Sequence, residues 1–358
     1  MTVSAETEAT TARLPIAVRR ARADDKSAVL AFASRTWDGW DYIPEVFDDW
    51  LTAADGVLLV ATRQADDRPV AVTRLAVLRG DEGWLEGIRV DPAVRGRGVA
   101  TNLQIAELAW AHAHDLRVLR YLTGIGNEGS IKLGAHHGFR LIGDRRFHGR
   151  PEAEDRPGDR PAALRALQSA GALLDTDADA ARITAAWQIV ERDATFRAGD
   201  RLYEDRPWTL QRLDRVRFEA HVRAGEVLQE AGGGAIAIMP GIAALAKDDR
   251  PHLAVLAGDG RDALRLALTA ESAAGQAIAV RMPDPAPMFA DAVVVEAWNE
   301  AGLGARAWAN HVLERRLPSG ESLPPAEPEG GLVLRDTPAS IARPRIVGAP
   351  LRLSGIEG

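Results

Sequence analysis

The chain has 358 residues, a length that suits two domains of ordinary size. Hydrophobic residues make up 46% of it and charged residues 27%, which is the composition of a globular protein with a real core. Its 44 basic and 51 acidic side chains give a formal charge of −7, which argues against a broad nucleic-acid-binding or anionic-membrane surface. The absence of cysteine excludes disulfides, thiolate zinc sites and a cysteine nucleophile.

The chain start lacks the basic and apolar stretches of a secretory signal. The longest uncharged run, 231–246, is short, glycine-rich and broken by Pro240. We therefore expect a cytoplasmic protein with no membrane span. Shifts in composition predict five segments: a polar tail over 1–13, a first domain over 14–150, a linker with helices over 151–207, a second domain over 208–317 and a Pro/Gly-rich segment over 318–358.

The first domain alternates strand and helix patterns. The apolar spacing predicts strands over 16–22, 57–63, 69–79, 84–90, 117–125, 139–143 and 144–149. Helices are predicted after the N-cap candidates Asp24 and Asp25, over 43–53, over 99–114 and over 127–137. This order is α+β, with an antiparallel meander before the long helix.

A glycine turn lies between the third meander strand and the long helix. Gly96 and Gly98 allow a tight turn with exposed N–H groups, the helix adds its positive dipole end, and Arg95 and Arg97 add charge. Such a turn can hold a pyrophosphate, whereas the alternative is an arginine-rich surface turn. It is neither a P-loop nor a dinucleotide fingerprint, because the Gly-Lys-Ser/Thr sequence and the third glycine are missing.

The pattern Arg95-x-x-Gly98-x-Ala100 after a Val-x-Pro strand end resembles the acetyl-CoA loop of GNAT N-acetyltransferases. The opening VRRARADD and the Asn127…Gly138-Phe139 spacing extend the resemblance to about residues 16–148. It implies two tandem GNAT-like domains, the second degenerate, each with a mixed, mostly antiparallel sheet flanked by helices. It also implies acetyl-CoA as co-substrate and no metal. The residues expected to bind acetyl-CoA are Ile88, Arg89, Val90, Arg95, Gly96, Arg97, Gly98, Val99, Ala100, Thr101 and Asn127.

Transfer to an amine needs a group that removes a proton near neutral pH. Glu86 is our candidate, since it lies in an apolar strand where burial would make its carboxyl a stronger base. The alternative is an outward-facing strand glutamate. Many family members place a tyrosine where this chain has Gly134, so the acid that protonates the thiolate stays open among His136, His137 and water.

The segment 37–50 holds five aromatic side chains and four aspartates. The resemblance to the GNAT fold implies that this segment caps the acceptor pocket. The residues expected to bind the acceptor are therefore Trp37, Trp40, Asp41 and Tyr42. The alternative is a helical hairpin packed through its aromatics. The GWDYIP…W stretch is similar to histidine N-acetyltransferase-like members of the family.

Residues 208–317 repeat the first half's order of elements, with a strand predicted over 252–257 and an alternation typical of final strands over 305–317. The matching turn carries Asp259 and Asp262, whose charges would oppose a phosphate, so a degenerate GNAT half is expected rather than a second CoA site. An unrelated α+β domain is the alternative. The sequence thus predicts an acetyl-CoA-dependent N-acetyltransferase acting on a small amine by direct attack. A non-catalytic acyl-CoA-binding protein and a protein acetyltransferase are its rivals, and a homodimer is left open.

Overall fold

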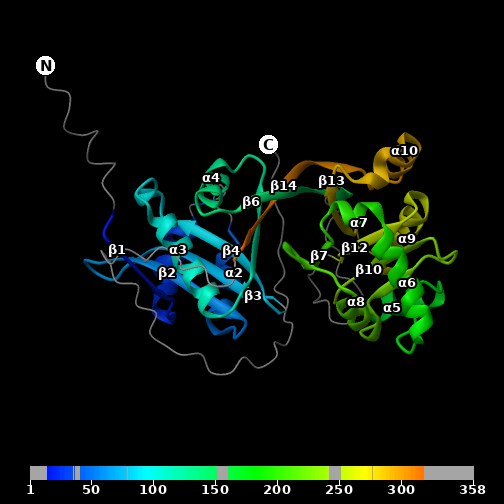
Figure 1. The fold of residues 1–358 in the computed structure, drawn as a ribbon, viewed down its shortest axis with the longest axis horizontal. Coiled ribbons are helices and arrows are strands. Elements are labelled where there is room, and N and C mark those ends of the chain that lie inside the picture. Colours follow the sequence, from blue (N-terminus) through cyan, green and yellow to red (C-terminus); the bar gives the residue numbers. More distant parts are fainter. Residues whose placement is uncertain are drawn as a thin grey trace, which may run out of the picture. The chain divides into compact units, whose positions relative to one another are not determined.

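The computed structural model describes residues 14–34, 36, 41–78, 80–150, 160–241, 251–275 and 277–317. These residues form two compact units (Figure 1). Unit 1 takes in 14–121, 128–140 and 313–317, and unit 2 takes in 122–127, 141–150 and the described residues from 160 to 312. The predicted polar tail, residues 151–159 of the predicted linker and the C-terminal segment lie outside the described residues.

Unit 1 is built on an antiparallel meander joined to a parallel strand. Its strands follow the order β1-β2-β3-β4-β5, with β1 to β4 antiparallel and β5 parallel to β4. The elements are β1 (Ile16–Arg20), α1 (Lys26–Ala33), α2 (Ile43–Thr52), β2 (Gly56–Arg63), β3 (Pro69–Val77), β4 (Glu82–Val90), α3 (Val99–Ala113), β5 (Val118–Gly124) and α4 (Glu128–His136).

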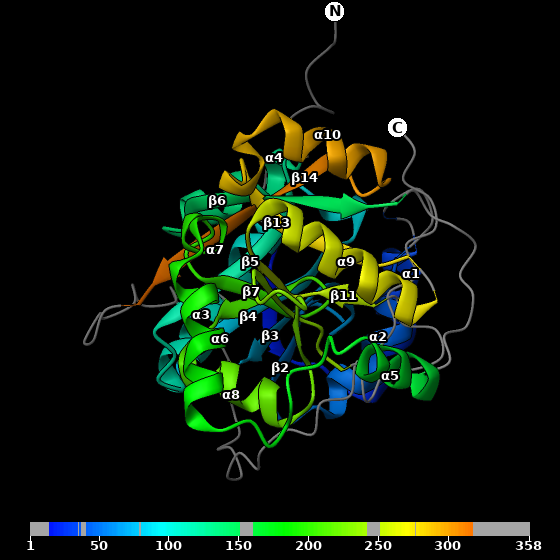
Figure 2. The same cartoon turned by 90° about the vertical axis from the view of Figure 1, so that its right-hand side faces the viewer.

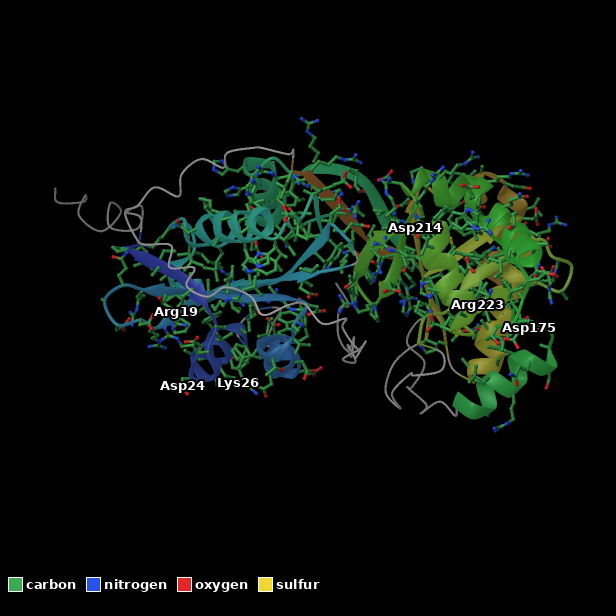
Figure 3. The ribbon with its side chains drawn as sticks, turned by 60° about the horizontal axis from the view of Figure 1, so that its bottom comes forward. Arg19, Asp24, Lys26, Asp175, Asp214 and Arg223 are labelled. Atoms are coloured by element: carbon green, nitrogen blue, oxygen red, sulfur yellow. The ribbon has the colours of Figure 1, made fainter. Side chains whose placement is uncertain are left out.

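The two faces of this sheet have separate cores because side chains alternate along each strand. Leu59 and Leu75 pack with Leu103 and Ala106 of α3 on one face. Leu58, Val60 and Val72 pack with α1 and α2 on the other. Figure 3 shows α3 on one side of the sheet and the two N-terminal helices on the opposite side.

The entry into α1 differs in detail from the prediction. The helix begins at Lys26, as the N-cap pattern indicates, but Asp25 makes no side-chain capping bond to it. The Asp25 carboxylate is buried and accepts hydrogen bonds from the Arg19 guanidinium at 2.7 and 2.8 Å and from the Arg22 N–H at 2.7 Å. Asp25 therefore joins β1 to the helix start, where Figure 3 labels Arg19, Asp24 and Lys26.

A buried ion triad ties the last described residues into unit 1. Arg120 of β5 pairs with Glu82 of β4 and, at 2.7 Å, with Glu314. Its guanidinium is only 2% exposed, so removing either carboxylate would leave a buried charge unbalanced. Residues 313–317, which the sequence pattern assigns to the second domain, thus group with the first unit.

Unit 2 contains a second meander followed by helix, strand, helix and strand. Its elements are β6 (Arg140–Gly149), α5 (Arg160–Ser169), α6 (Ala180–Arg192), α7 (Ala194–Ala198), β7 (Leu202–Arg206), β8 (Thr209–Arg212), α8 (Arg215–Arg223), β9 (Val227–Gln229), β10 (Ala235–Ile238), β11 (His252–Leu253), β12 (Val255–Gly258), α9 (Gly260–Ala274), β13 (Ala279–Asp284), α10 (Ala292–Glu300) and most of β14 (Ala305–Arg316), whose residues from 313 onward belong to unit 1. Figure 2 shows the helices of this unit, with α5 packed against α9.

Three predicted strand boundaries are wrong. The two strands predicted over 139–149 form the single strand β6, and the final alternation over 305–317 is the single strand β14. The strand predicted over 252–257 is broken at Ala254 into β11, which pairs with β13 in parallel, and β12, which pairs with β10. Among the described residues, no helix combines the length and apolar character needed to cross a membrane.

Candidate functional site

Strand β4 separates from β5 along its length. The parallel pairing covers Glu82, Gly83 and Trp84, which face Val118, Leu119 and Arg120. Among the described residues β4 continues to Val90 with β3 as its one ladder partner. The edge formed by residues 85–90 is therefore the place where an extended ligand could pair with backbone groups.

A β-bulge lies in this part of β4. Glu86 faces Arg74 and Arg89 faces Val72, so Gly87 and Ile88 together oppose Thr73. Gly87 has φ +70°, and a Cβ there would lie 2.5 Å from the Trp50 ring. Both the backbone conformation and the space beside Trp50 therefore require glycine. The extra residue changes the alternation and places both Glu86 and Arg89 on the face toward α2.

The glycine turn has the predicted geometry. Gly96 and Gly98 both adopt positive φ, +74° and +79°, and nothing lies within 4 Å of a Cβ built at either position. Gly98 is the N-cap of α3 and offers no side chain to its first amides. Within the part of the chain that the structure describes, the N–H groups of the first helical turn, from Val99 onward, are thus left for another acceptor.

The corresponding helix of unit 2 is closed by its own side chain. The Asp259 carboxylate accepts hydrogen bonds from the Arg261 N–H at 2.9 Å and the Asp262 N–H at 3.4 Å. Asp262 in turn pairs with Arg265. The amides that an anion would need at the start of α9 are occupied by a fixed negative charge.

Glu86 does not have the apolar surroundings predicted for it. Its carboxylate pairs with the Arg74 guanidinium, which also binds Asp55 at 2.6 Å and lies over the Trp50 ring. The prediction is wrong because Glu86, which precedes the extra residue of the bulge, lies beside the Arg74–Asp55 ion pair rather than among apolar side chains alone. The Glu86 side chain is 20% exposed, which leaves it accessible to a small molecule.

Asp41 and Tyr42, two predicted acceptor residues, pack against Arg89. The Asp41 carboxylate is fully buried and accepts from the Arg89 guanidinium at 2.6 and 3.2 Å, from the Ile43 N–H at 3.0 Å and from the Thr36 hydroxyl. These donors occupy its lone pairs, so Asp41 fixes the start of α2 on β4. Arg89 also lies over the Tyr42 ring, at 5.1 Å. Trp37 and Trp40 lie outside the described residues.

The comparisons with known proteins agree with this geometry. Residues 27–139 match the acetyltransferase (GNAT) family model. Those residues form a GNAT-family domain. They include the β4 bulge, the glycine turn, α3 and α4.

Two curated relatives match a smaller part of the chain. They are histidine N-acetyltransferases of Scomber australasicus, 31% identical over 78 residues, and Xenopus tropicalis, 32% identical over 77 residues. The matches cover 22% and 21% of this chain, and the chain spans only 23% of the length of either relative. A solved GCN5-related N-acetyltransferase of Sphaerobacter thermophilus has a similar fold, with a TM-score of 0.51 at 14% identity over 87% of this chain and 99% of its own.

In this GNAT domain, a steric contact explains why residue 134 of α4 is a glycine. A Cβ at residue 134 would lie 2.0 Å from the Tyr121 hydroxyl, which donates to the Ser130 carbonyl at 3.0 Å. The phenol of β5 thus occupies the space where a larger side chain would begin. Burial raises the pKa of Tyr121 to about 12.

The remaining predicted residues flank α4. Asn127 directly precedes the helix, is exposed, and its N–H donates to the Gly124 carbonyl at 2.9 Å. Burial lowers the pKa of His137 to about 4, so this imidazole is neutral at pH 7 and the acidic imidazolium form is scarce. Among the described residues, no group of three or more histidine and acidic side chains could hold a metal ion.

Sequence reasoning missed Glu107. This residue of α3 is 1% exposed, and its carboxyl lies 2.7 Å from the Thr73 hydroxyl. Burial raises the pKa of Glu107 to about 8, with Thr73 opposing the change. The signal in the sequence was its helical spacing from Leu103 and Trp110, which places Glu107 on the same buried face of α3.

Proposed function

We propose that the chain transfers an acetyl group from acetyl-CoA to a small amine, by direct attack of the amine on the thioester. The observation that carries the proposal is the combination of the uncapped α3 N-terminus at Gly98 with the β4 edge that β5 leaves unpaired. Both lie within the GNAT-family residues 27–139.

The glycine turn would hold the CoA pyrophosphate. The N–H groups after Arg95, through Thr101, would supply donors and the start of α3 its dipole, and the exposed Arg95 side chain would add charge near the phosphates. The backbone of Ile88, Arg89 and Val90 would pair with the pantetheine arm. An N–H group of this strand would stabilise the negative charge that develops on the acetyl oxygen.

The α2 face of β4 would receive the acceptor amine. Glu86 is the most exposed of three carboxylates there, beside Asp41 and Asp55. The negative charge of this accessible carboxylate favours a cationic acceptor. Glu86 would take the proton that the amine releases, while Tyr42 forms part of the pocket wall.

The acceptor class is proposed from the same cluster. We propose a small amine, and an amino acid is in keeping with the partial similarity to histidine N-acetyltransferases. We further propose that unit 2 is a degenerate GNAT-like half. It repeats the order of meander, helix, strand, helix and strand, and Asp259 occupies the amides at the start of α9.

One observation favours a second function, binding of acyl-CoA without turnover. Gly134 supplies no acid on α4, and His137 is neutral at pH 7. A screen of thiol release over amino acids, polyamines and aminoglycosides, with mass detection of the acetylated product, separates the two functions. Saturable release with an acetylated amine supports transfer. Tight acetyl-CoA binding with no release for any amine supports the second function.

A further inference from the structure

A series of hydrogen-bonded polar groups crosses the core of unit 1 and ends at the β4 bulge. The Thr73 hydroxyl lies 2.7 Å from the Glu107 carboxyl and 3.4 Å from the Glu86 backbone carbonyl. Thr73 is the residue of β3 that opposes the bulge, and it is 1% exposed. The series therefore reaches the bulge from the α3 face, opposite the face on which Arg74 holds the Glu86 side chain.

The protonation state of Glu107 sets the direction in which the Thr73 hydroxyl donates its hydrogen bond. A hydroxyl has one proton to donate. If Glu107 is ionised, the Thr73 proton goes to the carboxylate and the Glu86 carbonyl loses its donor. If Glu107 is neutral, its own O–H donates to Thr73, and the Thr73 proton is available to the Glu86 carbonyl.

The surroundings of Glu107 favour the neutral form. From β1, β2 and β4, the side chains in the same core are apolar, including Val18, Leu59 and Leu85. From β5, the titratable neighbour is Tyr121, whose phenol stays protonated because burial raises its pKa to about 12. Burial and Thr73 are the two influences on the pKa of Glu107, so no charged group among the described residues stabilises its carboxylate.

We propose that Glu107 acts as a positioning residue: held as a neutral acid, it directs the Thr73 hydroxyl onto the Glu86 carbonyl and so fixes the bulge that orients the N–H groups of residues 87–90. The inference rests on the proposed acetyl transfer, because its functional consequence is the placement of those N–H groups at the acetyl carbonyl. Ionisation of Glu107 releases the bulge, and transfer then slows above about pH 8.

The test compares Glu107→Gln with the wild type across pH 6.5–9.5, and Thr73→Val with Thr73→Ser. Glutamine donates like the neutral acid but does not titrate, so E107Q keeps kcat near pH 7 and loses the alkaline decline. T73V should lower kcat by about 3- to 10-fold, the scale of one hydrogen bond, with a smaller change in the KM for acetyl-CoA. T73S should restore kcat. Identical pH profiles for wild type and E107Q, or equal kcat for T73V and T73S, would overturn the inference.

A second measurement keeps this result separate from the proposed function. Amide hydrogen exchange at Gly87 and Ile88 reports the bulge without any substrate. Exchange should accelerate above about pH 8 beyond its ordinary pH dependence in the wild type and not in E107Q. That outcome with no turnover for any amine would defeat the proposed function while sustaining the role of Glu107. Normal turnover with equal exchange in both proteins would defeat the role of Glu107 alone.

Discussion

Burial of an acidic group predicts a stability that depends on pH in a defined direction. The pKa of Glu107 is raised from 4.5 to about 8 in the folded chain. The folded state therefore holds the proton more tightly than the unfolded state, and stability is full below about pH 4.5 and falls as pH rises toward 8. At about 1.4 kcal/mol per pKa unit, the whole loss corresponds to roughly 4–5 kcal/mol.

Glu107→Gln removes this dependence. Between pH 5 and pH 8.5 the free energy of unfolding of the variant should rise by about 4 kcal/mol relative to that of the wild type. This corresponds to a relative shift in Tm on the order of 10 °C for a unit of this size. Thermal and urea unfolding at matched pH values measure the difference. Taking the difference between the two proteins cancels other titrating groups, such as His137 and His148, whose pKa values burial lowers to about 4.

Glu128→Gln provides the matched control. This glutamate lies on α4 with its side chain 77% exposed, paired to Lys132. It should leave the pH dependence of unfolding unchanged, because an exposed pair contributes little. Parallel curves of unfolding free energy against pH for wild type and E107Q between about pH 5 and pH 8.5 would contradict this prediction. They would mean that Glu107 titrates in the folded protein as it does in the unfolded chain.

Three further predictions concern the face of β4 and the fold around α4. Glu86→Gln should lower kcat/KM by roughly 10²–10⁴-fold at neutral pH with acetyl-CoA affinity unchanged; turnover equal to that of the exposed control Glu45→Gln would remove Glu86 from the mechanism. Tyr42→Ala should raise the acceptor KM far more than the acetyl-CoA KM, whereas a joint rise with a lowered Tm would mean that Tyr42 only packs. Gly134→Ala should lower the Tm because its methyl group meets the Tyr121 hydroxyl, and adding Tyr121→Phe should recover part of the loss; no change in Tm would contradict the contact.

Much of the candidate site could be predicted from the sequence because it depends on local rules. Positive φ at Gly96 and Gly98, and the helix beginning at Val99, follow from residue type and short-range spacing. The strands of the meander follow from alternation of apolar residues.

The surroundings of Arg89 required information that local patterns lack. A bulge depends on the pairing of two strands, and one extra residue reverses every side chain that follows it. Simple alternation from Leu85 therefore places Arg89 toward α3, whereas it packs on Tyr42. The contact between Gly134 and Tyr121 likewise joins two elements, and the sequence shows only a missing tyrosine. Residues 313–317 group with unit 1 through Arg120, a partner almost two hundred positions earlier.

Calorimetric titration of the full chain with acetyl-CoA tests the central claim most directly. We expect one site per chain, lost in Gly98→Glu, which puts a charge at the phosphate-binding amides. Gly80→Glu is the matched control, because Gly80 has φ +76° and open space like Gly98 but lies in the turn between β3 and β4; this variant should bind as the wild type does. A stoichiometry of two, or binding that survives Gly98→Glu, would mean that the glycine turn before α3 is not the one acetyl-CoA site.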